Sequence, residues 1–214
     1  MRYFIGIDPS MNSTGICVQK YDGDEKIKEE FIILKPNNKL KPESKWLNRK
    51  EQLAQESNLP FEYMFYDKND LTAYKEHYHF YEYWKSNNMI SCANEIKNIV
   101  REFTKDDSET VQIVMEGISY GSVQRTKSIF DLAGLNYLVR ENFIEKEGFY
   151  ITIAPPSEIK KFASGNGNCN KEVMVSLFMS SHPEFDIIPK IDDISDAWFM
   201  SNYAKKLYNE NGRI

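Results

Sequence analysis

The first 34 residues alternate between apolar runs and short polar turns, a pattern that predicts three β-strands at residues 2–8, 14–21 and 26–34. The apolar run of the first strand ends at Asp8, and the Pro-Ser-Met-Asn-Ser-Thr-Gly turn that follows lets the chain reverse at once. The Asp-Gly-Asp tripeptide at 22–24 is a short hairpin signal. We therefore expect the three strands to follow one another in hairpin sequence.

Residues 36–87 break this pattern. A basic piece punctuated by prolines leads into a piece that is unusually rich in Phe, Tyr and Trp, and no clean period runs through either of them. We interpret this segment as an insertion after the third strand that packs on the main domain. Its aromatic side chains, interleaved with lysines, either fill a small satellite core, which is the interpretation we prefer, or stack on unpaired bases.

The rest of the chain alternates between helices and strands. Apolar residues at helical spacing predict a helix at 88–104, and the apolar run that ends at Met115 predicts a strand closed by Glu116. The later elements are a long helix from about 129 to near 148, a strand at 149–153, a short helix from Ser157, a helix from Asn170 to about 180, and a final helix at 192–209. This order predicts one α/β domain over residues 1–214, with a mixed five-stranded sheet flanked by helices.

Composition limits the classes of protein that fit. With 214 residues, 41% of them hydrophobic, the chain is expected to form one soluble globular domain. No apolar run approaches the length of a membrane helix, and no secretory leader precedes the first strand. Three scattered cysteines fit reduced thiols, so we expect a cytoplasmic protein with no membrane partner. The net charge of −5 weakly disfavours a protein that coats nucleic acid, although lysines cluster locally.

Four carboxylates occupy positions from which they could meet. A carboxylate at the end of a buried strand, such as Asp8, is costly to ionise unless a cation or hydrogen bonds compensate its charge. Glu116 also closes a strand, and Asp193 and Asp196 lie three residues apart on one face of the final helix. Hard ions such as Mg²⁺ and Mn²⁺ prefer oxygen ligands, whereas zinc prefers nitrogen and sulfur. The four acids are therefore candidate ligands for magnesium or manganese.

Four motifs occur along the chain in a fixed order: Gly6-Ile7-Asp8-Pro9-Ser10 with Thr14-Gly15, Met115-Glu116 after a strand, Lys160 with Lys171, and Asp193-Ile194-Ser195-Asp196-Ala197. Together they resemble the RuvC family of Holliday junction resolvases, within the RNase H-like superfamily. The resemblance covers residues 1–34 and about 88–209 and implies an RNase H-like fold. The Glu-Gly-Ile-Ser-Tyr-Gly-Ser run that begins at Glu116 resembles bacteriophage members of the family, which implies a location in the host cytoplasm.

The resemblance also implies roles for single residues. Asp8, Glu116, Asp193 and Asp196 match the acids that hold two divalent ions, Mg²⁺ or Mn²⁺, in the clefts of a homodimer. Because some relatives have a histidine at the third position, Asp192 is an alternative to Asp193. Lys160 and Lys171 match the lysines that contact the scissile region, and we assign Lys171 to the catalytic group.

Further residues are candidates for holding DNA. Lys160, Lys161, Arg125 and Lys127 would contact the phosphate backbone without reading its sequence. The family's stacking aromatic residue falls by strict counting on Ser119, so Tyr120 is the candidate for that role.

The expected function is that of a structure-selective endonuclease, which cuts Holliday junctions by two-metal phosphodiester hydrolysis. Three alternatives stay open: a broader nuclease that also cuts flaps and three-way branches, a non-catalytic junction binder, and an ATP-binding protein of the actin and sugar-kinase type. In the last, the turn after Asp8 would hold phosphate. The chain lacks the second Asp-x-Gly phosphate loop that such proteins need.

Overall fold

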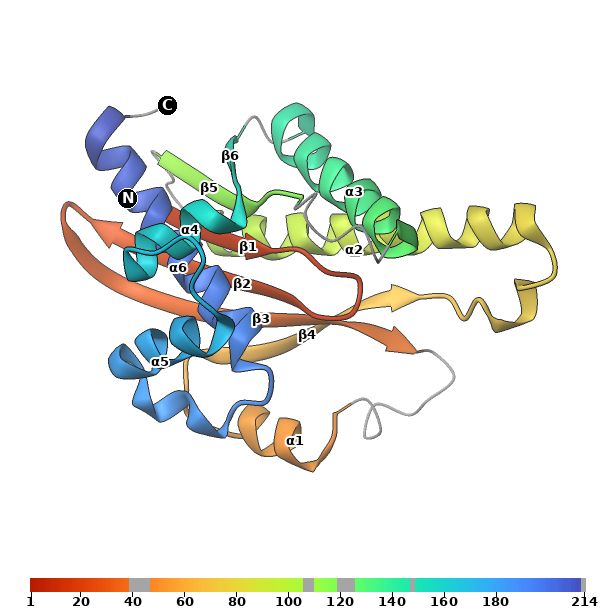
Figure 1. Ribbon diagram of the computed structural model, residues 1–214, viewed down its shortest axis with the longest axis horizontal. Helices are drawn as coiled ribbons and strands as arrows, with labels where there is room; N and C mark the ends of the chain where they lie inside the picture. The colour runs from red at the N-terminus through yellow and green to blue at the C-terminus, as the bar shows by residue number, and fades with distance from the viewer. Residues whose placement is uncertain (39–46, 106–109, 119–125, 147–148, 213–214) are drawn as a thin grey trace.

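A six-stranded mixed sheet forms the centre of the computed structural model, which describes residues 1–38, 47–105, 110–118, 126–146 and 149–212 (Figure 1). The strands are β1 (Arg2–Asp8), β2 (Thr14–Asp22), β3 (Glu25–Asn38), β4 (Phe61–Lys68), β5 (Thr110–Glu116) and β6 (Tyr150–Ala154), in the spatial order β4-β3-β2-β1-β5-β6. Strands β1, β2 and β3 pair antiparallel, as the hairpin signals predict, and the other neighbours pair parallel.

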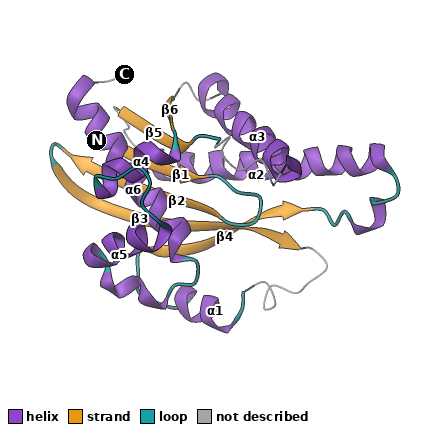
Figure 2. Cartoon of the chain, viewed as in Figure 1, coloured by secondary structure: helices purple, strands orange, loops and turns teal. Residues whose placement is uncertain are grey.

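Helices cover both faces of the sheet (Figure 2). One face carries α2 (Tyr78–Thr104), α3 (Thr126–Glu141) and the π-helical turn η4 (Asn142–Lys146). The other face carries α1 (Arg49–Gln55), α4 (Pro156–Ser164), α5 (Lys171–Ser181), the 3₁₀ segment η5 (Pro183–Ile187) and α6 (Ile191–Asn211). A short 3₁₀ turn, η2 (Thr72–Tyr74), precedes α2. The predicted α/β class is confirmed. None of the helices within the described ranges is long and apolar enough to span a membrane.

The prediction of five strands is wrong, because the aromatic segment contributes a sixth. Strand β4 pairs parallel with β3 from Phe61 to Lys68 and forms one edge of the sheet. Phe61 and Tyr63 are buried in the core beneath α5 and α6, whereas Tyr66 is buried in the core beneath α2. Because rings point to both faces, the period of two that marks a strand is hard to see in this part of the sequence.

The segment 36–87 also differs from the expected satellite core. Strand β3 continues to Asn38, and α2 begins at Tyr78, ten residues before the predicted start at 88. The buried rings of β4 belong to the two main cores, whereas Tyr78, Phe80 and Tyr83 at the start of α2 are 71%, 60% and 60% exposed. The aromatic side chains of β4 therefore pack in the cores of the sheet, whereas those at the start of α2 lie on the surface.

Helix α6 lies directly against the central strands. A Cβ atom on Gly6 of β1 would lie 1.9 Å from the carbonyl oxygen of Ala197, and a Cβ atom on Gly15 of β2 would lie 2.1 Å from that of Asp193. Close-packed interiors have no space for such overlaps, so any larger residue would push α6 away from the sheet. The two glycines therefore set the distance between α6 and strands β1 and β2.

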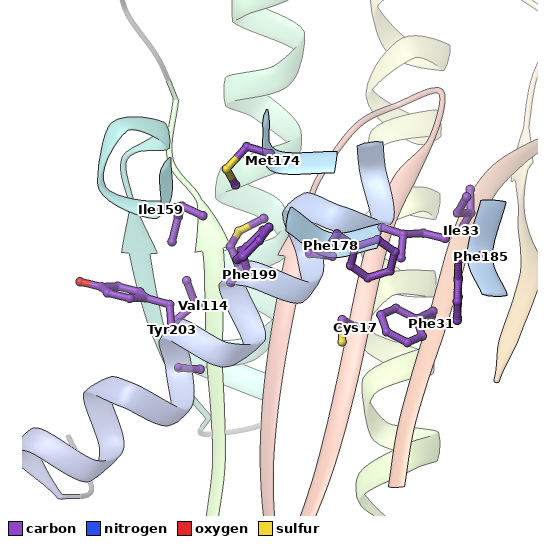
Figure 3. Close-up of a cluster of buried hydrophobic side chains, with 14 of the residues drawn as sticks. Cys17, Phe31, Ile33, Val114, Ile159, Met174, Phe178, Phe185, Phe199 and Tyr203 are labelled. Atoms are coloured by element: carbon purple, nitrogen blue, oxygen red, sulfur yellow. The ribbon is translucent and has the colours of Figure 1, made fainter. Parts of the chain in front are cut away.

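Aromatic packing holds the neighbouring α5 in place. The ring of Phe31 on β3 meets those of Phe178 on α5 and Phe185 in η5 at centroid distances of 5.8 and 4.9 Å, both edge-to-face. Figure 3 shows the three rings gathered at one end of this core, with Phe199 and Tyr203 of α6 at the other. Such pairs add about 0.5–1.5 kcal/mol each beyond the burial of their area. The packing fixes the position of α5, which begins at Lys171.

Candidate active site

Asp8 and Glu116 lie at the carboxyl ends of two neighbouring parallel strands, β1 and β5. Ile7 of β1 pairs in parallel with Met115 of β5, and each is followed by one of the two acids. Both side chains are partly buried, and their carboxyl groups hydrogen-bond to one another. A hydrogen bond between two carboxyl groups needs a proton on one of them. The two strand ends therefore place their acids in direct contact, as the sequence predicts.

The N-terminal turn of α6 brings the other two acids to the same place. Lys190, in the left-handed conformation with φ 60°, turns the chain into the helix. Ile194 and Ala197 face the sheet and are fully buried, which leaves Asp193 and Asp196 along its border. The charges of both act on Asp8. All four predicted acids thus gather at the ends of β1, β5 and α6.

Ser13 positions Asp193, a role that the motifs did not reveal. Its buried hydroxyl donates a hydrogen bond of 2.5 Å to Asp193 Oδ2. The turn that carries Ser13 is closed by the Thr14 hydroxyl, which accepts from the Ser10 backbone N–H at 3.0 Å and donates to the Ser10 carbonyl at 2.7 Å. The only signal in the sequence is a hydroxyl residue directly before Thr14-Gly15. The β1–β2 turn and α6 are thereby linked at the site.

Burial raises the pKa of every one of the four acids, and the charges of neighbouring carboxylates add to the rise at Asp8, Asp193 and Asp196. For Asp8 the pKa rises well above its usual range, first because of burial and then because of the charges of Glu116, Asp196 and Asp193. Burial also raises the pKa of Glu116 and Asp193, and it raises that of Asp196 to about 7, where the positive charge of Lys171 offsets part of the rise. The site therefore holds more carboxylates than its neighbouring lysines, Lys160 and Lys171, can neutralise.

Lys171 binds Asp192, which separates the roles of Asp192 and Asp193. Lys171 Nζ lies 2.5 Å from Asp192 Oδ2. Burial acts to raise the pKa of Asp192, but the hydrogen bond and charge of Lys171 outweigh it, so the pKa falls below its usual value. The Asn170 side chain caps α5 by accepting from the Val173 N–H at 3.0 Å, which fixes the start of the helix at Lys171. Lys171 therefore occupies Asp192, and it is the charge of Asp193, not that of Asp192, that acts on Asp8.

The predicted DNA-binding residues lie in different parts of the chain. Lys160 of α4 is partly buried, and its charge lowers the pKa of Glu116, so it lies near the acids. Lys161 is exposed on α4. Lys127 lies in the first turn of α3. Tyr120 and Arg125 lie outside the described residues.

The four acids offer the chemistry of a site for a hard cation, although they are not arranged as a finished cage. Within the described ranges, no three carboxylate, histidine or cysteine side chains are arranged around one point in a way that would hold a metal. Three of the four acids have local partners instead: Asp8 bonds Glu116, and Asp193 accepts from Ser13. The donors are oxygen atoms only, which suits Mg²⁺ and Mn²⁺. Because their charge is uncompensated, the residues fit a divalent ion.

Comparisons with known proteins give the fold. No protein-family model matches the chain, and no curated protein matches it by sequence. The solved structure of Thermus thermophilus RuvC matches with a TM-score of 0.55 and 13% identity, covering 99% of this chain and 97% of that chain. The structure of T. thermophilus RuvC in complex with a Holliday junction substrate matches with a TM-score of 0.57 and 10% identity, covering 99% and 98%. The chain therefore has the RuvC fold, and the RNase H-like prediction is confirmed.

The raised pKa of Asp196 predicts how stability depends on pH when no divalent ion is present. A folded-state pKa of about 7, against about 3.9 unfolded, means that the folded chain binds more protons between these values. The free energy of unfolding should therefore fall by roughly 1–4 kcal/mol as pH rises from about 4 through 7. Urea titrations at pH 5 and pH 8 in EDTA measure this change.

Asp196→Asn should reduce this dependence, because one of the four raised pKa values is removed, and should make the protein more stable than wild type at pH 8. The control is Asp186→Asn, since Asp186 is exposed in η5 and away from the four acids. It should keep the wild-type slope. Identical pH profiles for all three proteins would contradict the electrostatic account of the site.

Proposed function

We propose that this chain is a metal-dependent, structure-selective endonuclease that cuts Holliday junctions. The observation that carries the proposal is the gathering of Asp8, Glu116, Asp193 and Asp196 at one end of the central strands of a RuvC-type fold, with the pKa of each raised by burial. Phosphodiester hydrolysis by divalent ions needs carboxylates that can bind the ions, and this cluster at the strand ends supplies them. The match to a RuvC structure bound to a Holliday junction supports the choice of substrate.

Asp8, Glu116, Asp193 and Asp196 would hold two Mg²⁺ or Mn²⁺ ions. When bound, such ions lower the pKa of a water molecule and stabilise the oxygen that leaves the phosphate. The chain's part is to position the ligands: Ser13 fixes one oxygen of Asp193, and the contact with Glu116 fixes Asp8. Proton loss from Asp8, whose pKa is raised, would accompany ion binding.

The lysines would bind the phosphate that is cut and its neighbours. Lys171 has about half of its side chain exposed and is held by Asp192 next to the acids, so it can contact a phosphate without large movement. Lys160 lies near Glu116, and Lys161 is exposed one residue further along α4. Phosphate contacts of this kind position DNA but do not read its sequence. Arg125, Lys127 and Tyr120 remain candidates for the same surface.

The acids argue against the alternative of an ATP-binding protein. In that alternative the turn after Asp8 would hold nucleotide phosphates, yet Asp193 contacts Ser13 in this turn. Phosphates placed there would meet several carboxylates, and like charges repel unless cations separate them. The same acids could, however, cut three-way branches and flaps, so branch selectivity is left to experiment. We expect the enzyme in the cytoplasm, or in the host cytoplasm if a bacteriophage encodes it.

We propose further that the chain acts as a homodimer through α3. Phe130, Tyr137 and Ile144 recur every seven residues on α3 and η4 and are 75%, 60% and 56% exposed. Ile90 of α2, which packs beside α3, is 44% exposed. A row of large exposed apolar side chains favours a protein interface. A two-fold dimer would also match the symmetry of a four-way junction.

Asp8→Asn should lower the rate of cleavage of a four-way junction by roughly 10³-fold. It removes a ligand charge, and it should leave junction binding unchanged or tighter because repulsion with phosphate is reduced. The measurement uses labelled four-way, three-way, flap and linear DNA with Mg²⁺. Asp186→Asn serves as the control and should cut like wild type. Wild-type cleavage rates for Asp8→Asn would refute the assignment, and equal cutting of flaps by wild type would favour the broader nuclease.

The double variant Phe130→Ser with Tyr137→Ser should convert a dimer into a monomer, as measured by sedimentation velocity at micromolar concentration. Tyr is enriched among the few interface residues whose truncation weakens association by more than about 1 kcal/mol. The matched control is Ile187→Ser, because Ile187 is 48% exposed but lies in η5 on the opposite face of the sheet. A wild-type monomer, or a double variant that stays dimeric, would contradict this part of the proposal.

A further inference from the structure

A groove of about 610 Å³ begins at Glu116 and runs between α2, α3 and the end of β4. Its lining is mixed: Met11, Met89 and Leu132 give it an apolar surface, and Lys85 gives it a positive charge. Sites that bind small molecules occupy about 300–1,000 Å³ and combine an apolar lining with a few polar groups. The groove therefore has the size and chemistry of a ligand site and shares Glu116 with the acids.

A second hollow of about 360 Å³ continues the first. Lys68, Leu71 and Tyr81 line both, and the second extends to Lys75. We call the two together the β4–α2 groove. Figure 1 shows the N-terminal end of α2 reaching beyond the sheet and beyond α3, so this path leads outward from the acids.

Hydrogen bonds hold the wall of the groove in place. The buried Asn88 of α2 accepts from the Asn69 backbone N–H at 2.7 Å and donates to the Asn69 carbonyl at 3.1 Å. This pair ties the end of β4 to α2. Lys85 Nζ lies 2.7 Å from Asp131 Oδ1, which ties α2 to α3. The groove is therefore a formed feature, and binding would need little ordering of the chain.

Lysines and acids alternate along the groove, whose lining holds Lys85, Lys68 and Lys75 together with Glu116, Asp131 and Asp70. Lys85 lies near its inner half, Lys68 at its middle and Lys75 at its outer end. The charge of Lys85 is offset by Asp131, and Lys75 lies near Asp70. Neither Lys68 nor Lys75 forms an ion pair with a carboxylate in the part of the chain that the structure describes. Two lysines are thus available for anionic groups spaced along a chain.

We propose that the β4–α2 groove binds a short unpaired DNA strand next to the position of cleavage. A base would lie against Tyr81 and Met89, and phosphates would contact Lys68 and Lys75. Unpaired strands combine exposed base faces with a row of charges, and proteins bind them with aromatic side chains in a basic groove. Paired duplex covers its base faces, so it cannot use this apolar lining. The inference rests on the proposed function, because it makes Glu116 the inner end of the path.

The chain supplies a matched control. Tyr83 lies two residues after Tyr81 on the same helix, is 60% exposed and does not line the groove. It belongs instead to a separate hollow of about 490 Å³ with Tyr74, Phe80 and Trp84 at the outer end of α2. Comparing variants of Tyr81 with variants of Tyr83 therefore distinguishes binding in the groove from non-specific binding of DNA to exposed aromatic rings.

The test uses the full chain in EDTA, so that no cleavage occurs, with an eight-nucleotide single strand that carries one 5-iodouracil. Irradiation and mass spectrometry should locate the crosslink at Tyr81 or Met89. Tyr81→Ala should weaken binding of this strand about tenfold. Tyr81→Leu, which keeps apolar bulk, should show a similar loss without a change in melting temperature. Tyr83→Ala should bind like wild type.

Lys75→Gln gives an independent measurement. Losing one phosphate contact should reduce the slope of log affinity against log salt by about 0.7 for a single strand. The control is Lys50→Gln, since Lys50 is exposed on α1, which packs against the opposite face of the sheet. Crosslinks confined to residues outside the groove, or equal effects of the Tyr81 and Tyr83 variants, would overturn the inference.

The outcome is separable from that of the proposed function. If the single strand binds in the groove but no branched DNA is cut, the inference about the groove is supported and the proposed nuclease activity is contradicted. If four-way junctions are cut but no crosslink forms at Tyr81 or Met89, the nuclease activity is supported and the groove is not a binding site for the strand.

Discussion

The contact between α6 and the backbone of β1 and β2 is the constraint on which the candidate site depends. At Gly6 and Gly15 the helix approaches so closely that no Cβ atom would fit. This approach brings Asp193 and Asp196 from the end of the chain to Asp8 near its beginning. Because interiors are close-packed, even a small shift of the helix would move both acids together. The site is therefore a property of the packing of α6 and not of any single loop.

The gathered acids carry an electrostatic cost that the chain reduces only in part. Asp8 and Glu116 hydrogen-bond to one another, Ser13 donates to Asp193, and Lys171 is occupied by Asp192. None of these contacts removes the repulsion, as the contribution of neighbouring carboxylates to the raised pKa values of Asp8 and Asp196 shows. Like charges kept in a partly buried place, without a structural partner for each, are typical of functional sites because stability alone would not retain them. This imbalance is the physical reason for proposing divalent ions here.

Strand ends and helical spacing were enough to predict that the four acids lie close together, because an acid that closes an apolar run has few possible positions in a sheet. Their role as metal ligands stays a prediction. The choice between Asp192 and Asp193 could not be made this way, since it depends on Lys171, which lies 21 residues away in the sequence. Strand β4 was missed because its rings serve both faces, and the role of Ser13 because a serine in a polar turn is ordinary. The early start of α2 was hidden by the same aromatic residues. Tyr120 and Arg125 lie outside the described residues, so they stay predictions.

The most direct test of the account is the position of Mn²⁺ in crystals of the protein soaked with this ion, located from its anomalous scattering. The account predicts two bound ions among Asp8, Glu116, Asp193 and Asp196, with Asp192 still bound to Lys171. Ions bound only elsewhere, or none at concentrations at which Mn²⁺ supports cleavage, would contradict the central claim that these four acids form a metal centre.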